Sequence, residues 1–205
     1  MIRIDYSAFF GTNIERIVFP EGLIEIGSYA FSNCKIKEIV LPNSITSIER
    51  ATFSISLIEK ITLPENLVYI LDNAFQFCKN LKSIELPSQV KYIGYNAFEG
   101  CKNLERIFIS KSVNTIYINA FKDCPKLKIY CEGEPQPNWI DHEKKTIVND
   151  DYDETSLYSF NYHRSAGSFD SMQKTEVIHN SYNPDKNQLY TNVSREEFIK
   201  LSDNE

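Results

Sequence analysis

The stretch Leu81-Lys82-Ser83-Ile84-Glu85-Leu86-Pro87 is the unit from which most of this chain is built. In this unit it is followed at fixed positions by Val90, Ile93, Gly94, Ala97, Phe98 and Cys101. The phenylalanine recurs in steps of 22 or 23 residues, at Phe9, Phe31, Phe53, Phe75, Phe98 and Phe121. Self-similarity at such a period indicates a solenoid, because no single unit can bury its apolar face alone.

The apolar residues Leu81, Ile84 and Leu86 follow the pattern L-x-x-L-x-L, which is typical of the strand half of a leucine-rich repeat. Side chains alternate along a strand, so Ile84 and Leu86 point inward while Ser83 and Glu85 point outward. We expect six parallel strands on a concave face, near Ile17–Phe19, Ile39–Leu41, Ile61–Leu63, Ile84–Leu86, Ile107–Ile109 and Ile129–Cys131.

The arc that runs from Ile93 to Phe98 contains too few residues for a helix, so it predicts extended segments or 3₁₀ turns. The recurring phenylalanines are expected to stack as an internal column. They therefore belong to the core and not to a ligand cage. The glycine that follows the isoleucine of this arc survives only as Gly27 and Gly94, so we expect no positive φ there.

The whole repeat, I-x-x-I-G-x-x-A-F-x-x-C-x-x-L-x-x-I-x-L-P-x-x-V, closely resembles the BspA-like family of leucine-rich repeats over residues 1–140. The resemblance implies an α/β-type leucine-rich-repeat solenoid with short parallel strands on the concave face and little helix in the repeats. Members of that family are mostly described as cell-surface proteins of bacteria or protists that bind other proteins. The resemblance thus implies a recognition scaffold but identifies no ligand.

Two units are predicted: a solenoid at residues 1–140 and an acidic appendage at residues 141–205 that is partly disordered or docked. Arrays of this family often close with Ile-Tyr-Cys-Glu, prolines and a tryptophan, which implies that Trp139 folds over the last coil as a lid. A binding site that contains Trp139 is the alternative. Near residues 195–201 a capping box, Ser194-Arg195-Glu196-Glu197, predicts a short helix with Phe198, Ile199 and Leu201 on one stripe.

Charge is distributed unevenly along the chain. Residues 1–131 hold 15 Lys and Arg against 13 Asp and Glu, whereas residues 132–205 hold 7 against 15. This balance makes nucleic acid a poor partner. No apolar run is long enough for membrane insertion. No secretory signal is visible at the N-terminus, which favours the cytoplasm unless the chain is a fragment of a longer exported protein.

Four of the five cysteines occupy one column of the repeat. Cys34, Cys78, Cys101 and Cys124 share that column with Thr12 and Ser56. A column that accepts Cys, Thr and Ser requires a small side chain with a weak donor. Structural free thiols are therefore favoured, with a disulfide or a metal site as the alternative.

We predict no enzyme activity, no catalytic residue, no metal and no cofactor. The three histidines, His142, His163 and His179, all lie in the appendage, and no recognisable catalytic motif accompanies them. An enzyme built in the appendage is thus the weakest hypothesis.

The outward strand positions predict a protein-binding surface at Arg106, Phe108, Lys128 and Tyr130. Exposed aromatic residues on a rigid strand are good anchors for a partner. The leading hypothesis is a non-enzymatic protein-binding scaffold that uses the concave face. The alternatives are that the appendage itself covers these aromatics, or that the chain is an intracellular regulator or inhibitor acting through its acidic tail. End-to-end self-association at the N-terminal edge strand is a further expectation.

Overall fold

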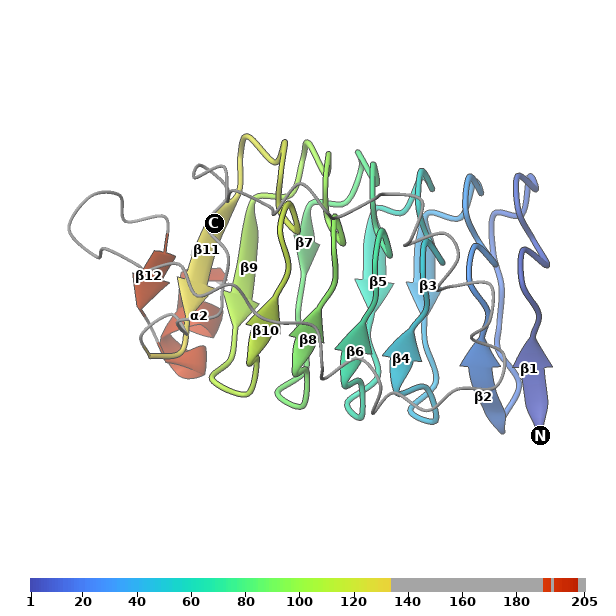
Figure 1. The fold of residues 1–205 in the computed structure, drawn as a ribbon, viewed down its shortest axis with the longest axis horizontal. Coiled ribbons are helices and arrows are strands. Elements are labelled where there is room, and N and C mark those ends of the chain that lie inside the picture. The colour runs from blue at the N-terminus through green and yellow to red at the C-terminus, as the bar shows by residue number, and fades with distance from the viewer. Residues whose placement is uncertain (134–189, 193, 203–205) are drawn as a thin grey trace, which may run out of the picture.

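The computed structural model describes residues 1–133, 190–192 and 194–202. Within them, short coils stand side by side along the long axis of the molecule (Figure 1). The elements in chain order are β1 (Ile2–Ile4), β2 (Leu23–Ile26), β3 (Glu38–Val40), β4 (Ser47–Ile48), β5 (Lys60–Thr62), β6 (Tyr69–Ile70), β7 (Ser83–Ile84), β8 (Tyr92–Ile93), β9 (Arg106–Ile109), β10 (Thr115–Ile116), β11 (Lys128–Cys131), β12 (Tyr190–Asn192) and α2 (Arg195–Ser202).

The first face of the solenoid consists of β3, β5, β7, β9 and β11, the strands that the sequence predicts on the concave face; they form two sheets, β3-β5 and β7-β9-β11-β12. All of its pairings are parallel, and equivalent repeat positions lie opposite one another, as Ile107 lies opposite Ile84 and Ile129. Prolines follow β3, β5 and β7, at Pro42, Pro64 and Pro87, and end these segments because they lack an N–H for the ladder. A turn follows, in which Val90 N donates to Pro87 O at 3.1 Å.

The strand predicted near Ile17–Phe19 does not form. An end coil has one neighbour instead of two, so its strand loses half of its possible pairing. Val18, in the middle of this segment, is 93% exposed. In this coil and the one before it, the strand pairing that does form is that of β1 with β2, on the opposite face.

The second face is made by β1, β2, β4, β6, β8 and β10, in the arcs that lead toward the phenylalanines. Four of these strands form one parallel ladder in the order β10-β8-β6-β4. Each has only two residues, and turns follow directly. Extended and turn structure was predicted for these arcs, and the prediction of little helix in the repeats is confirmed. The sequence pattern did not indicate that the extended parts pair into a second ladder.

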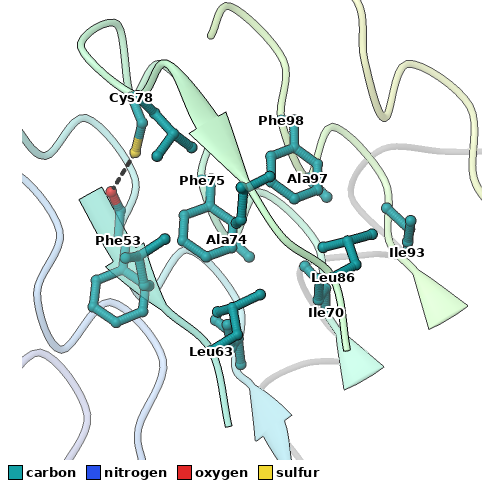
Figure 2. Close-up of a cluster of buried hydrophobic side chains, with 14 of the residues drawn as sticks. Phe53, Leu63, Ile70, Ala74, Phe75, Cys78, Leu86, Ile93, Ala97 and Phe98 are labelled. Atoms are coloured by element: carbon teal, nitrogen blue, oxygen red, sulfur yellow. Dashed lines mark hydrogen bonds between the residues drawn. The ribbon is translucent and has the colours of Figure 1, made fainter. Parts of the chain in front are cut away.

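The predicted phenylalanine column is confirmed, and it forms the centre of the core (Figure 2). Adjacent rings are nearly parallel, with interplanar angles of 5° to 13° and centroids 5.1 to 5.8 Å apart. The rings of Phe53, Phe75 and Phe98 are almost inaccessible to solvent. Ring stacking therefore adds to the burial of apolar area from coil to coil.

Each phenylalanine is flanked by two residues in the left-handed region. One column, two positions before the phenylalanine, contains Ser7, Tyr29, Ala51, Asn73, Asn96 and Asn119. The other, two positions after it, contains Gly11, Asn33, Ile55, Phe77, Gly100 and Asp123. Gly27 and Gly94 are in neither column and have no positive φ, as predicted.

The left-handed residues let backbone donors alternate between two directions. In the fourth repeat, Phe98 N donates to Ala120 O of the next coil at 2.7 Å, and Gly100 N donates to Lys122 O at 2.8 Å. Between them, Glu99 N donates back to Asn96 O at 3.1 Å within its own coil. Buried backbone groups are thus paired without a ladder of asparagine side chains.

The cysteine column supplies further donors. Cys78 Sγ donates to Phe53 O of the preceding coil at 3.0 Å (Figure 2). The same bond joins Cys34 to Phe9, Cys101 to Phe75 and Cys124 to Phe98. The predicted role of this column, a small side chain that is a weak donor, is confirmed. All five cysteines are free thiols in the structure.

Candidate binding surface

The four residues of the predicted surface lie together on two neighbouring strands. In the parallel pairing of β9 and β11, Arg106 lies opposite Lys128 and Phe108 lies opposite Tyr130. The intervening residues Ile107 and Ile129 point into the core. The period of two along each strand therefore positions a basic pair and an aromatic pair on the outward side.

Their exposure differs from the expectation. Lys128 is exposed, whereas Arg106 and Tyr130 are half-buried. Phe108 is only 3% exposed, so the prediction that it is an exposed anchor is wrong. The alternative, that the C-terminal segment covers the outward aromatics, is the arrangement found.

Helix α2 is the element that covers Phe108. The ring of Phe198 lies 5.3 Å from the ring of Phe108 and 5.2 Å from that of Tyr130, measured between centroids. Both pairs are tilted, with interplanar angles of 34° and 59°. Such tilted contacts are favourable for aromatic quadrupoles. Phe198 is itself 6% exposed, so the three rings form a small apolar cluster outside the main core.

Arg195 contributes the second contact of α2 with the sheet. Its Nη1 donates to Leu86 O at 3.2 Å, just beyond the end of β7. Its guanidinium carbon lies 6.0 Å from the centroid of the Phe108 ring, at the outer limit of a cation–π contact. Residues three apart share one face of a helix, so Arg195 and Phe198 approach Phe108 together.

The predicted capping box starts this helix. Ser194 Oγ accepts from Glu197 N at 3.2 Å, and the Glu197 carboxylate accepts from Ser194 N at 2.7 Å. Hydrogen bonds from the backbone N–H and the hydroxyl of Ser194 hold the pKa of Glu197 below its usual value. The predicted apolar stripe is only partly realised, because Phe198 is buried whereas Ile199 is 47% exposed.

Strand β12 leads into α2 and extends the sheet beyond β11. It pairs in parallel with β11, with Tyr190 opposite Ile129 and Asn192 opposite Cys131. The run Tyr190-Thr191-Asn192-Val193 contains aromatic and β-branched residues, a signal for a strand that the sequence analysis did not use. A segment from near the C-terminal end of the sequence thus lies beside the last strand of the solenoid and pairs with it.

The N-terminal half of the first face is open. Val18 is 93% exposed and Val40 is 66% exposed, and the flanking Glu38, Lys60 and Thr62 are exposed too. The first face therefore has two halves of different character. The N-terminal half exposes isolated apolar and charged side chains to solvent, and the C-terminal half contains an aromatic cluster that Phe198 covers.

Neither a cluster of potential metal ligands nor a membrane-spanning helix is present in the described part of the chain. Among residues 1–133, 190–192 and 194–202, no three His, Cys, Asp or Glu side chains are grouped as metal ligands would be. No helix in these ranges is long and apolar enough to cross a membrane. Trp139 and the three histidines lie outside the described residues, so the lid and the appendage hypotheses are not addressed by the structure.

The repeat matches a known family. Residues 2–128 match the model of the BspA type leucine-rich repeat region in 6 copies. No curated protein matches the sequence.

Solved structures of leucine-rich-repeat proteins are similar to this chain. One is a leucine-rich repeat protein of T. pallidum, with 24% identity and a TM-score of 0.48 over 63% of this chain and 51% of that one. Another is a leucine-rich cell surface protein of Faecalibacterium prausnitzii, with 21% identity and a TM-score of 0.46 over 64% and 52%. A protein of Bacteroides ovatus has 22% identity and a TM-score of 0.45 over 63% and 46%. The matched region spans about half the length of these relatives.

Proposed function

Because this chain belongs to the family of BspA type leucine-rich repeats, we propose that it is a non-enzymatic scaffold that binds another protein through the first face of its solenoid. The repeat supports a scaffold role, since stacked coils create an extended, rigid surface that such proteins commonly use for recognition. The described part of the chain offers outward side chains in regular columns and no group of three His, Cys, Asp or Glu placed to hold a metal ion.

The observation that carries the proposal is the contact surface made by the rings of Phe108 and Tyr130, which we call the seat. These two rings, on adjacent strands, accept an aromatic side chain from a helix that is remote in sequence. A surface that holds one amphipathic segment has the chemistry needed to hold another. Aromatic residues with arginine beside them are also the types that most often dominate binding energy at protein interfaces.

The proposal is tested by capturing partners from a lysate of the source organism with the full-length chain, after chemical cross-linking. Val40→Asp and Phe108→Asp each place a charge on the first face, one in each half. Leu57→Asp is the matched control, since Leu57 is 42% exposed but lies outside the outward columns of that face.

We expect Leu57→Asp to capture the same protein as the unmodified chain and at least one first-face variant to lose it. If all three variants capture it equally, the first face is not the binding surface. Melting curves that resemble that of the unmodified chain are needed for each variant, so that a loss of capture reports on the surface and not on unfolding.

A further inference from the structure

We propose that the segment Tyr190–Ser202 is a built-in mimic of the partner, and that the first face recognises a strand followed by a short helix with arginine and phenylalanine one turn apart. This inference rests on the proposed function and specifies the class of its partner. The expected partner segment is an amphipathic helix that displaces α2 from the sheet.

The recognition elements of α2 are few and well defined. Phe198 fills the space between Phe108 and Tyr130, and Arg195 reaches over Phe108 to Leu86 O. Glu196, Glu197, Ile199 and Lys200 of the same helix are exposed. An arginine and a phenylalanine at positions i and i+3 therefore define the helical part of the recognised pattern.

The strand β12 defines the other part of the pattern. It adds to β11 in parallel register over Ile129, Tyr130 and Cys131. Main-chain hydrogen bonds of an added strand provide affinity that depends little on sequence, whereas the side chains that enter pockets provide specificity. A partner segment of this class thus needs an extended stretch before its helix.

The seat, formed by Phe108 and Tyr130, is held in place by the core of the solenoid. Phe108 and Tyr130 lie on β9 and β11, whose inward residues Ile107, Ile109 and Ile129 are buried in the main core. The register of the two strands fixes the spacing of the aromatic pair. Little reorganisation is therefore required when one helix leaves and another arrives.

The occupant, in contrast, is a short helix. The helix α2 has 8 residues, and isolated helices of this length are marginal in water. Phe198 is its only side chain described as buried. Its attachment to the same chain favours it over a free segment, because tethering raises the local concentration. A competing helix must therefore overcome this advantage, and a variant that releases α2 should bind such a helix more tightly.

The probe is a fluorescently labelled peptide with the sequence of residues 190–205 of this chain. It is titrated into the full-length protein and into the full-length Phe198→Asp variant, and binding is followed by fluorescence anisotropy. The same titration is made with two further variants. The Phe108→Asp/Phe198→Asp double variant lacks the Phe108 ring of the seat, and Ile199→Asp changes an exposed residue of the same helix.

We expect the peptide to bind Phe198→Asp about tenfold or more tighter than the unmodified protein, since the seat is then vacant. Ile199→Asp should behave like the unmodified protein. The double variant, and a peptide that carries Phe198→Asp, should lose about thirtyfold or more in affinity, as expected for a central aromatic anchor. Each protein must retain the melting curve of the solenoid for the comparison to hold.

Absence of binding to Phe198→Asp, or binding to the double variant that is as tight as binding to Phe198→Asp, would overturn the proposed mimicry. These results differ from a failure of the proposed function. If the peptide does not bind while Val40→Asp or Phe108→Asp still abolishes capture of the partner, the first face is a binding surface that recognises a different kind of segment.

Discussion

The ring of Phe198 on α2 lies 5.3 Å from the ring of Phe108 on β9. By its place in the repeat, Phe108 faces away from the core, yet it is 3% exposed because the helix covers it. A single contact between distant parts of the sequence thus divides the first face into a covered half and an open half.

Removing a ring from the middle of the phenylalanine column should destabilise the protein strongly. Phe98→Ala empties a fully buried position that stacks on Phe75 and Phe121, so we expect a loss of about 3 to 5 kcal/mol in the free energy of unfolding. Phe9→Ala should cost less, because Phe9 is half-buried in the end coil. Denaturant melts measure both values, and equal losses would contradict the stacked column.

Substitutions in the cysteine column should show how much a hydrogen-bond donor at that position contributes to the free energy of unfolding. Cys78 donates to Phe53 O of the preceding coil, and Cys78→Thr keeps a donor at this position, as in Thr12 of the same column, whose hydroxyl donates to Phe9 O of its own coil. Cys78→Val has nearly the same shape without a donor. We expect the valine variant to be less stable than the threonine variant by about 1 kcal/mol in denaturant melts. If the valine variant is the more stable, the bond to Phe53 O contributes nothing.

The thiols should differ in reactivity in the native state. Burial raises the pKa of Cys78 to about 12, and the hydrogen bond to Cys124 together with burial raises the pKa of Cys101. The same bond lowers the pKa of Cys124, which is only half-buried. Because the thiolate is the reactive form, iodoacetamide near neutral pH should label Cys124 first.

Mass spectrometry of digested protein, sampled over time with and without denaturant, identifies the labelled sites. Cys78 and Cys101 are expected to react only after unfolding. Native labelling of Cys78 as fast as that of Cys124 would show that the column is open to solvent.

The repeat itself could be predicted from the sequence. The steps of 22 and 23 residues locate the phenylalanine column, and the shared column of Cys, Thr and Ser indicates a small donor at that position. Both features repeat in every coil, so the signal is reinforced several times. Strands β3, β5, β9 and β11 also lie within one residue of their predicted positions, because an inward isoleucine marks each of them.

Two features of the fold have weaker signals in the sequence than the repeat has. Strands β4, β6, β8 and β10 of the second face are two residues long, too short for an alternating pattern. The left-handed columns contain Asn73, Asn96 and Asn119 but also Tyr29 and Ile55. Since asparagine and glycine are the residues that adopt this conformation readily, their partial enrichment was the available clue.

The covered half of the candidate surface was the least predictable part. The capping box indicates where α2 begins, but not where the helix docks. That depends on how Phe198 and Arg195 meet Phe108 and Leu86, which are remote in the sequence. A repeat pattern describes contacts between neighbouring coils and contains no information about a segment outside the array.

Replacing a β-branched residue in a left-handed conformation should stabilise the protein. Ile55 has a φ of 61° and is 53% exposed, so its side chain strains the backbone without filling the core. Ile55→Asn should raise the free energy of unfolding by about 1 kcal/mol. Ile24→Asn is the control, because Ile24 is 37% exposed in strand β2 and is not among the positive-φ residues. Thermal melts in which both variants lose stability would refute the strain at Ile55.

The docking of α2 on the aromatic pair is tested most directly by hydrogen–deuterium exchange followed by mass spectrometry. The amides of residues 194–202 are compared in the unmodified protein, Phe108→Asp, Phe198→Asp and the double variant, with peptides from the second face as an internal reference. Docking protects these amides, so we predict that each single variant accelerates their exchange and that the double variant adds nothing further. Exchange in the second-face peptides should stay unchanged. If residues 194–202 exchange equally fast in the unmodified protein and in Phe108→Asp, α2 does not dock on Phe108, and the account of the first face as a seat for a helix is contradicted.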